Sequence, residues 1–198
     1  MSLAIALPSP DDAPEIGAVH LAAWLRTYPN AAAGITEEWL TEQRGDLVEP
    51  AGIAGWRAFL VDALDRPDLH FCRVVRAESE IAGFLCGRRA PQEGAGAEAS
   101  GVSLGPMYLL EAAQGQGVGR RLMSEFLGWA GSRPVHLWVT SYNERAIRFY
   151  ADHGFRPTGE RTLWRGRLPN VRMLRDPGPV VGRAPGERVN AVSETRRS

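Results

Sequence analysis

The chain has 198 residues, of which 44% are hydrophobic, and its 23 Lys and Arg balance its 23 Asp and Glu. This length predicts one domain, or one domain with a short annex, and the composition excludes bulk disorder. A protein that binds nucleic acid or anionic membranes in a general way needs a basic excess. We therefore expect neither nucleic acid nor a membrane as a partner.

The lack of targeting segments and the small number of cysteines both favour a cytoplasmic protein. No stretch approaches the ~18 consecutive apolar residues of a transmembrane helix, and the opening residues lack the basic region of a signal peptide. Cys72 and Cys86 lie in strand-like runs and are too few for a disulfide framework or a metal cluster. We expect buried, reduced thiols, no metal site and a cytoplasmic location.

The first third of the chain reads as one strand and three helices. Residues 3–7 alternate as a strand does, and the proline-rich segment after them breaks the pattern. Asp11 and Asp12 suit a helix start, and the first helix runs to about residue 26. A cap with acidic residues in the first turn starts a second helix over residues 36–47, and apolar spacing predicts a third over residues 53–64.

The remainder alternates strands with two further helices. The expected elements are strands at 69–76, 81–88 and 102–110, a helix after 114–119, a strand at 135–140, a helix at 143–153, and a final strand pair at 156–165 and 171–175. Residues 91–101 are expected to form a mobile loop. We predict an α+β domain over residues 1–176 and a polar tail without structure of its own over 177–198.

A glycine-rich turn joins the strand at 102–110 to the next helix. It comprises Gln114, Gly115, Gln116, Gly117, Val118 and Gly119. The glycines let the backbone approach a ligand with no Cβ in the way. Because the first amides of the helix lack internal acceptors and the dipole adds positive charge there, the turn is predicted to bind a phosphate.

Two common phosphate motifs fit this turn poorly. A P-loop needs Gly-Lys-Ser/Thr, whereas Gly119 is followed by Arg120 and Arg121. The dinucleotide fingerprint needs a third glycine where Arg120 stands. On the glycines alone, a flexible turn without a ligand stays open.

A second motif narrows the choice. Asn143 opens the stretch Asn-Glu-Arg-Ala-Ile-Arg-Phe-Tyr, which ends at Tyr150 and is followed by Gly154 and Phe155. Together with the glycine turn, this sequence resembles the GNAT superfamily of N-acetyltransferases. The turn matches that family's Arg/Gln-x-x-Gly-x-Gly/Ala motif, and the second stretch matches its Asn-x-x-Ala-x-x-Phe-Tyr-x-x-x-Gly-Phe motif. The resemblance runs from about residue 81 to residue 155.

The resemblance implies a GNAT-like α+β fold, with a mixed, mostly antiparallel sheet, a splayed strand pair and helices on both faces. It also implies acetyl-CoA as the acyl donor. The pyrophosphate would lie on the glycine turn, the pantetheine arm would pair with the preceding strand, and the thioester would reach through the splayed pair. The residues implied to contact the donor are Met107, Tyr108 and Leu109; Gln114, Gly115, Gln116, Gly117, Val118, Gly119 and Arg120; and Asn143. Core packing for Met107 and Leu109, and helix capping for Asn143, are compatible alternatives.

Tyr150 stands where the family usually has its general acid. Attack of an amine on a thioester forms an oxyanion and then expels a thiolate, to which a nearby phenol can donate a proton. A backbone amide near Met107 to Leu109 can stabilise the oxyanion. The alternative role of Tyr150 is a core aromatic beside Phe149.

The general base is not evident from the sequence. An amine near pH 7 is mostly protonated and must lose a proton before it attacks. Many relatives carry a Glu at the strand position that Ser103 occupies here. Glu111 is expected near the pyrophosphate rather than the acceptor, which leaves His20, Glu98 or a chain of waters as candidates.

The tryptophans of the N-terminal helices are candidates for the acceptor wall. Trp24, Trp39 and Trp56 lie in that region, and Trp24 with Tyr28 can form an apolar or cation-accepting pocket. Packing of these helices against the sheet is the favoured alternative. Trp138, on the splayed strand, faces either the donor or the core.

These observations together predict an acetyl-CoA-dependent N-acetyltransferase acting by direct attack in a ternary complex. A small molecule or a peptide with a primary amine is the expected acceptor, and a homodimer is compatible with the sequence. A non-catalytic acyl-CoA-binding module is the main alternative, because Glu is absent at Ser103. A different nucleotide-phosphate binder is the second.

Overall fold

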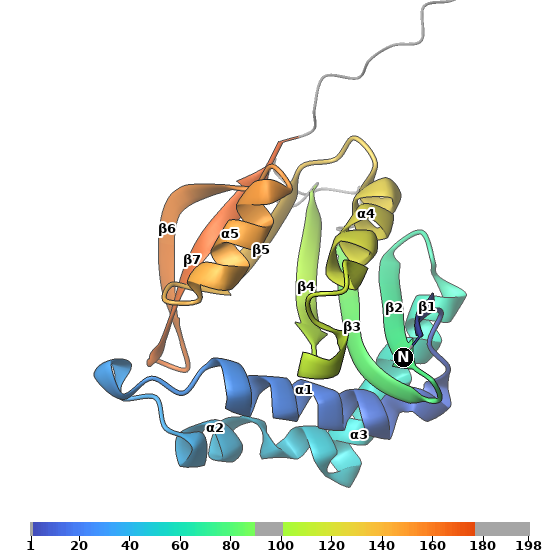
Figure 1. The fold of residues 1–198 in the computed structure, drawn as a ribbon, viewed down its shortest axis with the longest axis horizontal. Coiled ribbons are helices and arrows are strands. Elements are labelled where there is room, and N and C mark those ends of the chain that lie inside the picture. The colour runs from blue at the N-terminus through green and yellow to red at the C-terminus, as the bar shows by residue number, and fades with distance from the viewer. Residues whose placement is uncertain (1, 90–100, 177–198) are drawn as a thin grey trace, which may run out of the picture.

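A computed structural model describes residues 2–89 and 101–176 of the chain (Figure 1). Nearly all of the loop predicted at residues 91–101, which contains Glu98, lies outside these ranges, as does the tail predicted over 177–198. The described strands and helices follow each other in the predicted order.

One seven-stranded sheet forms the centre of the fold, in the order β1-β2-β3-β4-β5-β7-β6. Every neighbouring pair is antiparallel except β4 and β5, which run parallel. The strands are β1 (Leu3–Ala6), β2 (His70–Ala77), β3 (Glu80–Arg89), β4 (Val102–Leu109), β5 (Val135–Thr140), β6 (Arg156–Trp164) and β7 (Leu168–Arg175). The predicted mixed, mostly antiparallel sheet is confirmed.

Helices cover both faces of this sheet. They are α1 (Ala13–Thr27), α2 (Glu37–Arg44), α3 (Pro50–Asp65), α4 (Val118–Ala130) and α5 (Glu144–Asp152). On β3, Phe84 and Cys86 belong to the cluster that packs against α1 and α3, whereas Leu85 between them belongs to the cluster under α4 and α5. The alternation of side chains along a strand therefore gives each helical layer its own buried core.

The strand pair β4–β5 splays apart, as predicted. The two strands pair only at Val102 with Val135 and at Ser103 with His136, and then diverge toward the end of β4 (Figure 1). A third buried cluster joins α1 and α2 to the β6–β7 hairpin through Trp24, Ile35, Leu40 and Leu168. The N-terminal helices thus connect the two parts of the sheet across the open end of the gap.

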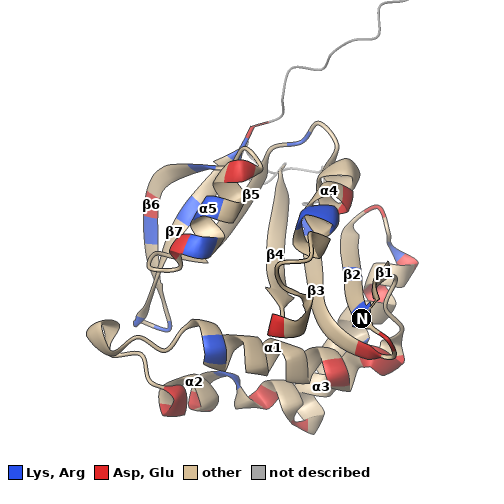
Figure 2. Ribbon diagram, viewed as in Figure 1, with Lys and Arg blue, Asp and Glu red and all other residues tan. Residues whose placement is uncertain are grey.

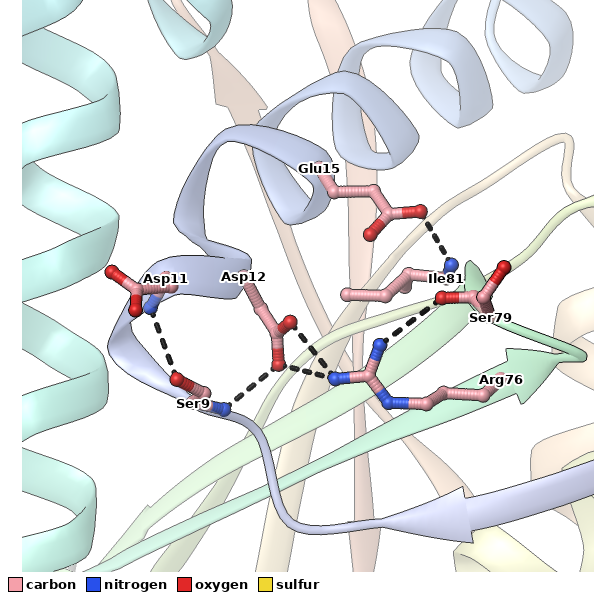
Figure 3. A network of polar contacts seen from close by, with 7 residues as sticks. All are labelled: Ser9, Asp11, Asp12, Glu15, Arg76, Ser79 and Ile81. Atoms are coloured by element: carbon pink, nitrogen blue, oxygen red, sulfur yellow. Dashed lines mark hydrogen bonds and ion pairs between the residues drawn. The ribbon is translucent and has the colours of Figure 1, made fainter.

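A polar network anchors the start of α1 to the β2–β3 hairpin (Figure 3). Ser9 and Asp12 form a capping box ahead of α1, and the Arg76 guanidinium donates to both Asp12 carboxylate oxygens at 2.8 and 2.7 Å. Glu15 accepts from the Ile81 amide at 2.6 Å. Because α1 is fixed at this end, the side chains further along it are held over the gap.

The second helix ends earlier than the sequence predicted. The α-helix ends at Arg44, and a short 3-10 helix, η3 (Gly45–Val48), follows it directly. The helices on either side approach η3 closely through glycines: a Cβ on Gly17 would lie 2.2 Å from the Leu47 carbonyl oxygen, and one on Gly52 would lie 1.9 Å from that of Asp46. Tertiary contact with α1 and α3 thus replaces regular helix in this segment.

Two smaller findings complete the fold. Within the described ranges, no helix combines the length and the apolar character that crossing a membrane requires. Cys72 and Cys86 are free and buried, as predicted, and their sulfur atoms lie 3.2 Å apart on neighbouring strands.

Candidate active site

A cleft of about 850 Å³ follows the gap between β4 and β5. Its walls come from β4, from the glycine turn and the start of α4, from β5 and α5, and from α1 and the β6–β7 hairpin. The cleft therefore leads from the glycine turn, past the splayed strands, to the aromatic side chains of the N-terminal helices.

The glycine turn has a backbone that favours glycine at two positions. Gly115 and Gly117 both have φ of 75°, and Gly117 caps the N-terminus of α4. A Cβ at either position would meet nothing within 4 Å, so space for a ligand lies beside the backbone. At Gly119, by contrast, a Cβ would come within 3.2 Å of Leu109, which shows that this glycine allows α4 to pack closely on β4.

The predicted turn residues differ in their surroundings. Gln114 and Gly119 line the cleft. The Val118 side chain is buried in the core, which leaves its backbone as the group available to a ligand. Gln116 donates from Nε2 to the Ala112 carbonyl at 2.7 Å. The turn thus presents mainly backbone, as a phosphate site at a helix N-terminus requires.

Basic side chains flank the gap on two helices. Figure 2 shows Lys or Arg at the start of α4 and on α5, on opposite sides of the space between β4 and β5. Arg120 of α4 lies 3.8 Å from Asp152 of α5, and both side chains are exposed. Arg145 donates to the Gln114 side chain, whose Nε2 in turn donates to the Leu109 carbonyl at 2.7 Å. This chain of contacts ties α5 to the turn and to the end of β4.

The backbone of β4 offers an open edge to the gap. The Leu110 amide donates to the Ala82 carbonyl, and the register pairs Tyr108 with Phe84. Because hydrogen-bonded pairs alternate in an antiparallel ladder, the Tyr108 backbone faces β3, whereas the Met107 and Leu109 backbones face the gap. The Tyr108 backbone therefore belongs to the β3–β4 ladder, and its side chain lines the cleft.

Tyr150 lies in the cleft among other tyrosines. It is buried on α5, and burial together with the nearby Tyr28 raises its pKa above the ordinary value for tyrosine. The Tyr28 and Tyr108 hydroxyls lie 2.9 Å apart. A phenol with a raised pKa keeps its proton throughout the neutral range, which a general acid requires.

Asn143 caps α5, as predicted. Its side-chain oxygen accepts from the Ala146 amide at 3.1 Å, and the residue also lines the cleft. The Trp138 side chain faces the cleft rather than the core, because it lines that space and is exposed.

Aromatic rings surround His20 at the far end of the cleft. The centre of its ring lies 5.0 to 6.0 Å from the ring centres of Trp24, Trp56, Phe84 and Tyr108. Its Nδ1 is buried, and no described residue forms a hydrogen bond with it. Burial, with a smaller effect of the Arg44 charge, lowers the pKa of His20 to about 3. A neutral imidazole this weakly basic is poorly suited to remove a proton from an ammonium group.

The remaining residues that bear on the general base lie at different places. Ser103 lines the cleft at the last paired position before β4 and β5 separate. Glu111 also lines it, in an ion pair with Arg26 of α1. Glu98 lies outside the described residues.

Some cleft residues were not predicted from the sequence. Thr140, Arg44, Arg145, Trp164 and Asn170 all line it. Arg145 lies inside the second motif, next to Asn143, and that position was a usable signal. The others carry no local signal, because Arg44 resembles any basic residue in the last turn of a helix and Trp164 and Asn170 belong to a strand pair outside the resemblance.

A sequence model described as the acetyltransferase (GNAT) family matches residues 25–155. The chain belongs to the GNAT family. The match covers the glycine turn, the splayed strands and α5, and so includes every residue predicted to contact the donor or to act as general acid.

Solved structures of this family share the fold. The PaiA N-acetyltransferase of Thermoplasma acidophilum, in complex with coenzyme A, superposes with a TM-score of 0.67 at 19% identity, covering 89% of this chain and 99% of that one. YncA of Salmonella typhimurium, a proposed acetyltransferase with acetyl-CoA, gives 0.63 at 17% identity, covering 89% and 94%. At these identities the likeness concerns the fold.

Curated relatives match over shorter stretches. A mycothiol acetyltransferase of Jonesia denitrificans is 36% identical over 95 residues, which are 46% of this chain and 28% of the relative. An uncharacterised N-acetyltransferase of Mycobacterium bovis is 42% identical over 65 residues, which are 31% of this chain and 42% of the relative. The matches span less than half of either relative.

Proposed function

We propose that this chain transfers the acetyl group of acetyl-CoA to a primary amine by direct attack in a ternary complex. The observation that carries the proposal is the continuous cleft of about 850 Å³, which joins the glycine turn, the open edge of β4, Tyr150 and an aromatic wall. The GNAT fold and relatives that are crystallised with coenzyme A or acetyl-CoA support it.

The donor would be held mainly by backbone. Acetyl-CoA supplies a thioester, whose carbonyl carbon accepts the amine. The amides of residues 114–119 fit its pyrophosphate, because Gly115 and Gly117 leave open space where other residues would carry a Cβ. The backbones of Met107 and Leu109 face the gap and fit the amides of the pantetheine arm, as an added strand does. Asn143 lines the cleft, and Arg120 follows the glycine turn on α4; we propose that both contact the donor.

Tyr150 would provide the proton that the departing sulfur needs. Its hydroxyl is protonated at neutral pH, as that of an ordinary tyrosine is, and burial raises its pKa further. The neighbouring pair of Tyr28 and Tyr108 hydroxyls, 2.9 Å apart, fits a route by which that proton is replaced.

The amine would reach the site already neutral or give its proton to water. His20 is too weak a base, since its pKa is lowered to about 3. The rate would then follow the ionisation of the amine itself and depend on positioning, which alone can contribute several kcal/mol (about 7–11 in favourable cases).

One observation favours a second candidate function. Ser103, at the fork of the splayed strands, cannot act as a carboxylate base. A non-catalytic acyl-CoA sensor would bind acetyl-CoA but release no free coenzyme A in the presence of amines. Thiol release with a panel of amines separates the two functions.

Two substitutions at Gly117 test the donor site. Alanine and glutamate share the strain of φ at 75°, so both should lower stability by similar amounts. Only glutamate adds a charge; at about 6 Å from a phosphate and an effective dielectric near 20, repulsion of about 3 kcal/mol weakens binding roughly 10²-fold. Calorimetric titration with coenzyme A measures the difference. Equal affinity of the Gly117→Glu and Gly117→Ala variants would refute the donor site.

A further inference from the structure

A second cavity of about 530 Å³ adjoins the acceptor end of the cleft. The two spaces share Arg44, Ser103, Gly105 and Pro106 as lining residues. The rest of the second cavity comes from η3, α3 and β3, and most of its lining is apolar or glycine, including Leu47, Trp56 and Phe59. An acceptor whose amine lies at the fork of β4 and β5 would place its remaining atoms here.

Arg44 stands at the junction of the two spaces. Its guanidinium carbon lies 5.1 Å from the centre of the Trp24 ring, and its buried Nε has no hydrogen-bond partner among the described residues. Within the described ranges no carboxylate pairs with it, whereas Arg26, Arg57 and Arg76 each pair with an acidic side chain. Partial burial of an unpaired charge is costly, so a carboxylate from a ligand would complete this site.

Further arginines lie around the two spaces. Arg88 also lines the second cavity, with its guanidinium over Phe59. Arg165 and Arg167, at the blue tip of the β6–β7 hairpin in Figure 2, lie over Trp164 and Trp39 beside the cleft.

Acidic groups are fewer around these spaces. In the described part of the chain, Asp46 is the acidic residue that lines the second cavity, and Glu111 is the one that lines the cleft. Glu111 is already paired with Arg26. This balance disfavours a polycationic amine and favours an anionic group on the acceptor.

We propose that the acceptor is an amine that also carries a carboxylate and an apolar group, as an apolar amino acid does. The Arg44 guanidinium receives the carboxylate, and the apolar group fills the second cavity against Trp56 and Phe59, which pack edge to face in its wall. This inference rests on the proposed acetyl transfer, and it adds the class of acceptor. A guanidinium suits the role because its fork matches a carboxylate in two hydrogen bonds.

Matched acceptors test the proposal on the unaltered chain. L-phenylalanine, L-leucine and L-methionine are compared with 2-phenylethylamine, 3-methylbutylamine and 3-(methylthio)propylamine, which lack only the carboxylate; spermidine serves as the polycation. Coenzyme A release is followed with a thiol reagent, and acetyl-CoA affinity is measured separately. We expect kcat/KM, calculated per concentration of neutral amine, to be roughly tenfold to a hundredfold higher for the acids than for their partners, as a charge-assisted hydrogen bond allows.

The outcomes separate this inference from the proposed function. Failure to bind acetyl-CoA would refute the proposed function itself. Three results would overturn the acceptor class alone, provided that acetyl-CoA binds normally. They are equal turnover within each pair, spermidine as the best acceptor, and no turnover of any acid.

A variant pair locates the carboxylate. Arg44→Met should bring the ratio of acid to decarboxylated partner close to one, mainly through a higher KM for the acid. Arg57→Met is the matched control, because Arg57 pairs with Asp11 and lines neither space. An unchanged ratio in an Arg44→Met protein that binds acetyl-CoA normally would overturn the assignment of Arg44. If that variant does not fold, the acceptor comparison on the unaltered chain decides.

Discussion

Two glycines on α3 allow a direct test of how the wall of the second cavity is packed. A Cβ on Gly52 would lie 1.9 Å from the Asp46 carbonyl oxygen and 2.9 Å from the Leu47 Cα, both backbone atoms of η3. A Cβ on Gly55, one turn further along the same helix, would meet nothing within 4 Å. Alanine at these two positions therefore has the same helix propensity and opposite packing consequences.

The expected difference in stability follows from these distances. Gly55→Ala should stabilise the protein by up to about 1 kcal/mol, the propensity gain at an exposed helix position. Gly52→Ala has the same gain, but η3 must move by about 1.5 Å to restore ordinary contact, and overpacking of this kind costs about 1–3 kcal/mol. We take the upper end because the opposing atoms are backbone. The variants should then differ by about 3 kcal/mol, or about 6–12 °C in Tm.

Urea unfolding and calorimetric melting of the two variants measure this difference. Gly52→Ala should also raise KM for the acceptor, because Asp46 and the preceding Arg44 belong to the segment that moves, while its affinity for coenzyme A changes little. Melting of the two variants within about 2 °C of each other would refute the close contact between α3 and η3.

Three further predictions concern single side chains. Tyr150→Phe should lower kcat roughly 10²-fold with little change in acetyl-CoA affinity, and an unchanged kcat would leave Tyr150 as a packing residue. Burial lowers the pKa of His20 to about 3, so below pH 6.5 the unfolded chain binds a proton that the folded chain does not. Between pH 7 and pH 5 the natural chain should therefore lose about 2 kcal/mol more unfolding free energy than His20→Leu, and parallel curves would contradict a buried neutral imidazole. Burial raises the pKa of the Cys86 thiol, so Cys72 and Cys86 should react with a thiol reagent only when the chain unfolds; rapid labelling of the native protein would contradict their burial.

The order of elements and the backbone conformation of the glycine turn were predictable because their signals are local. The strand at 135–140 was predicted with its observed ends, and Asn143 caps α5 as its residue type suggests. The glycines at 115 and 117 have the left-handed backbone for which glycine is the preferred residue. Each of these features depends on neighbours within a few residues, so local sequence is enough to predict it.

Tertiary structure determines which backbone groups of β4 bond to β3 and which face the gap. The sequence does not distinguish the backbones of Met107, Tyr108 and Leu109. The register with β3 makes the Tyr108 backbone face β3 and leaves the other two facing the gap. The end of the second helix at Arg44 likewise follows from the packing of η3 against Gly17 and Gly52 rather than from its own residues.

The acceptor side depended on tertiary structure most of all. Arg44, Trp164 and Asn170 reach one cleft from elements separated by more than half of the chain. The sequence alone predicted an acetyltransferase fold and the conformation of its glycine turn, because short motifs encode a backbone conformation. The charge and shape offered to the acceptor came only from the folded chain, because they depend on where a splayed strand pair lets distant side chains meet.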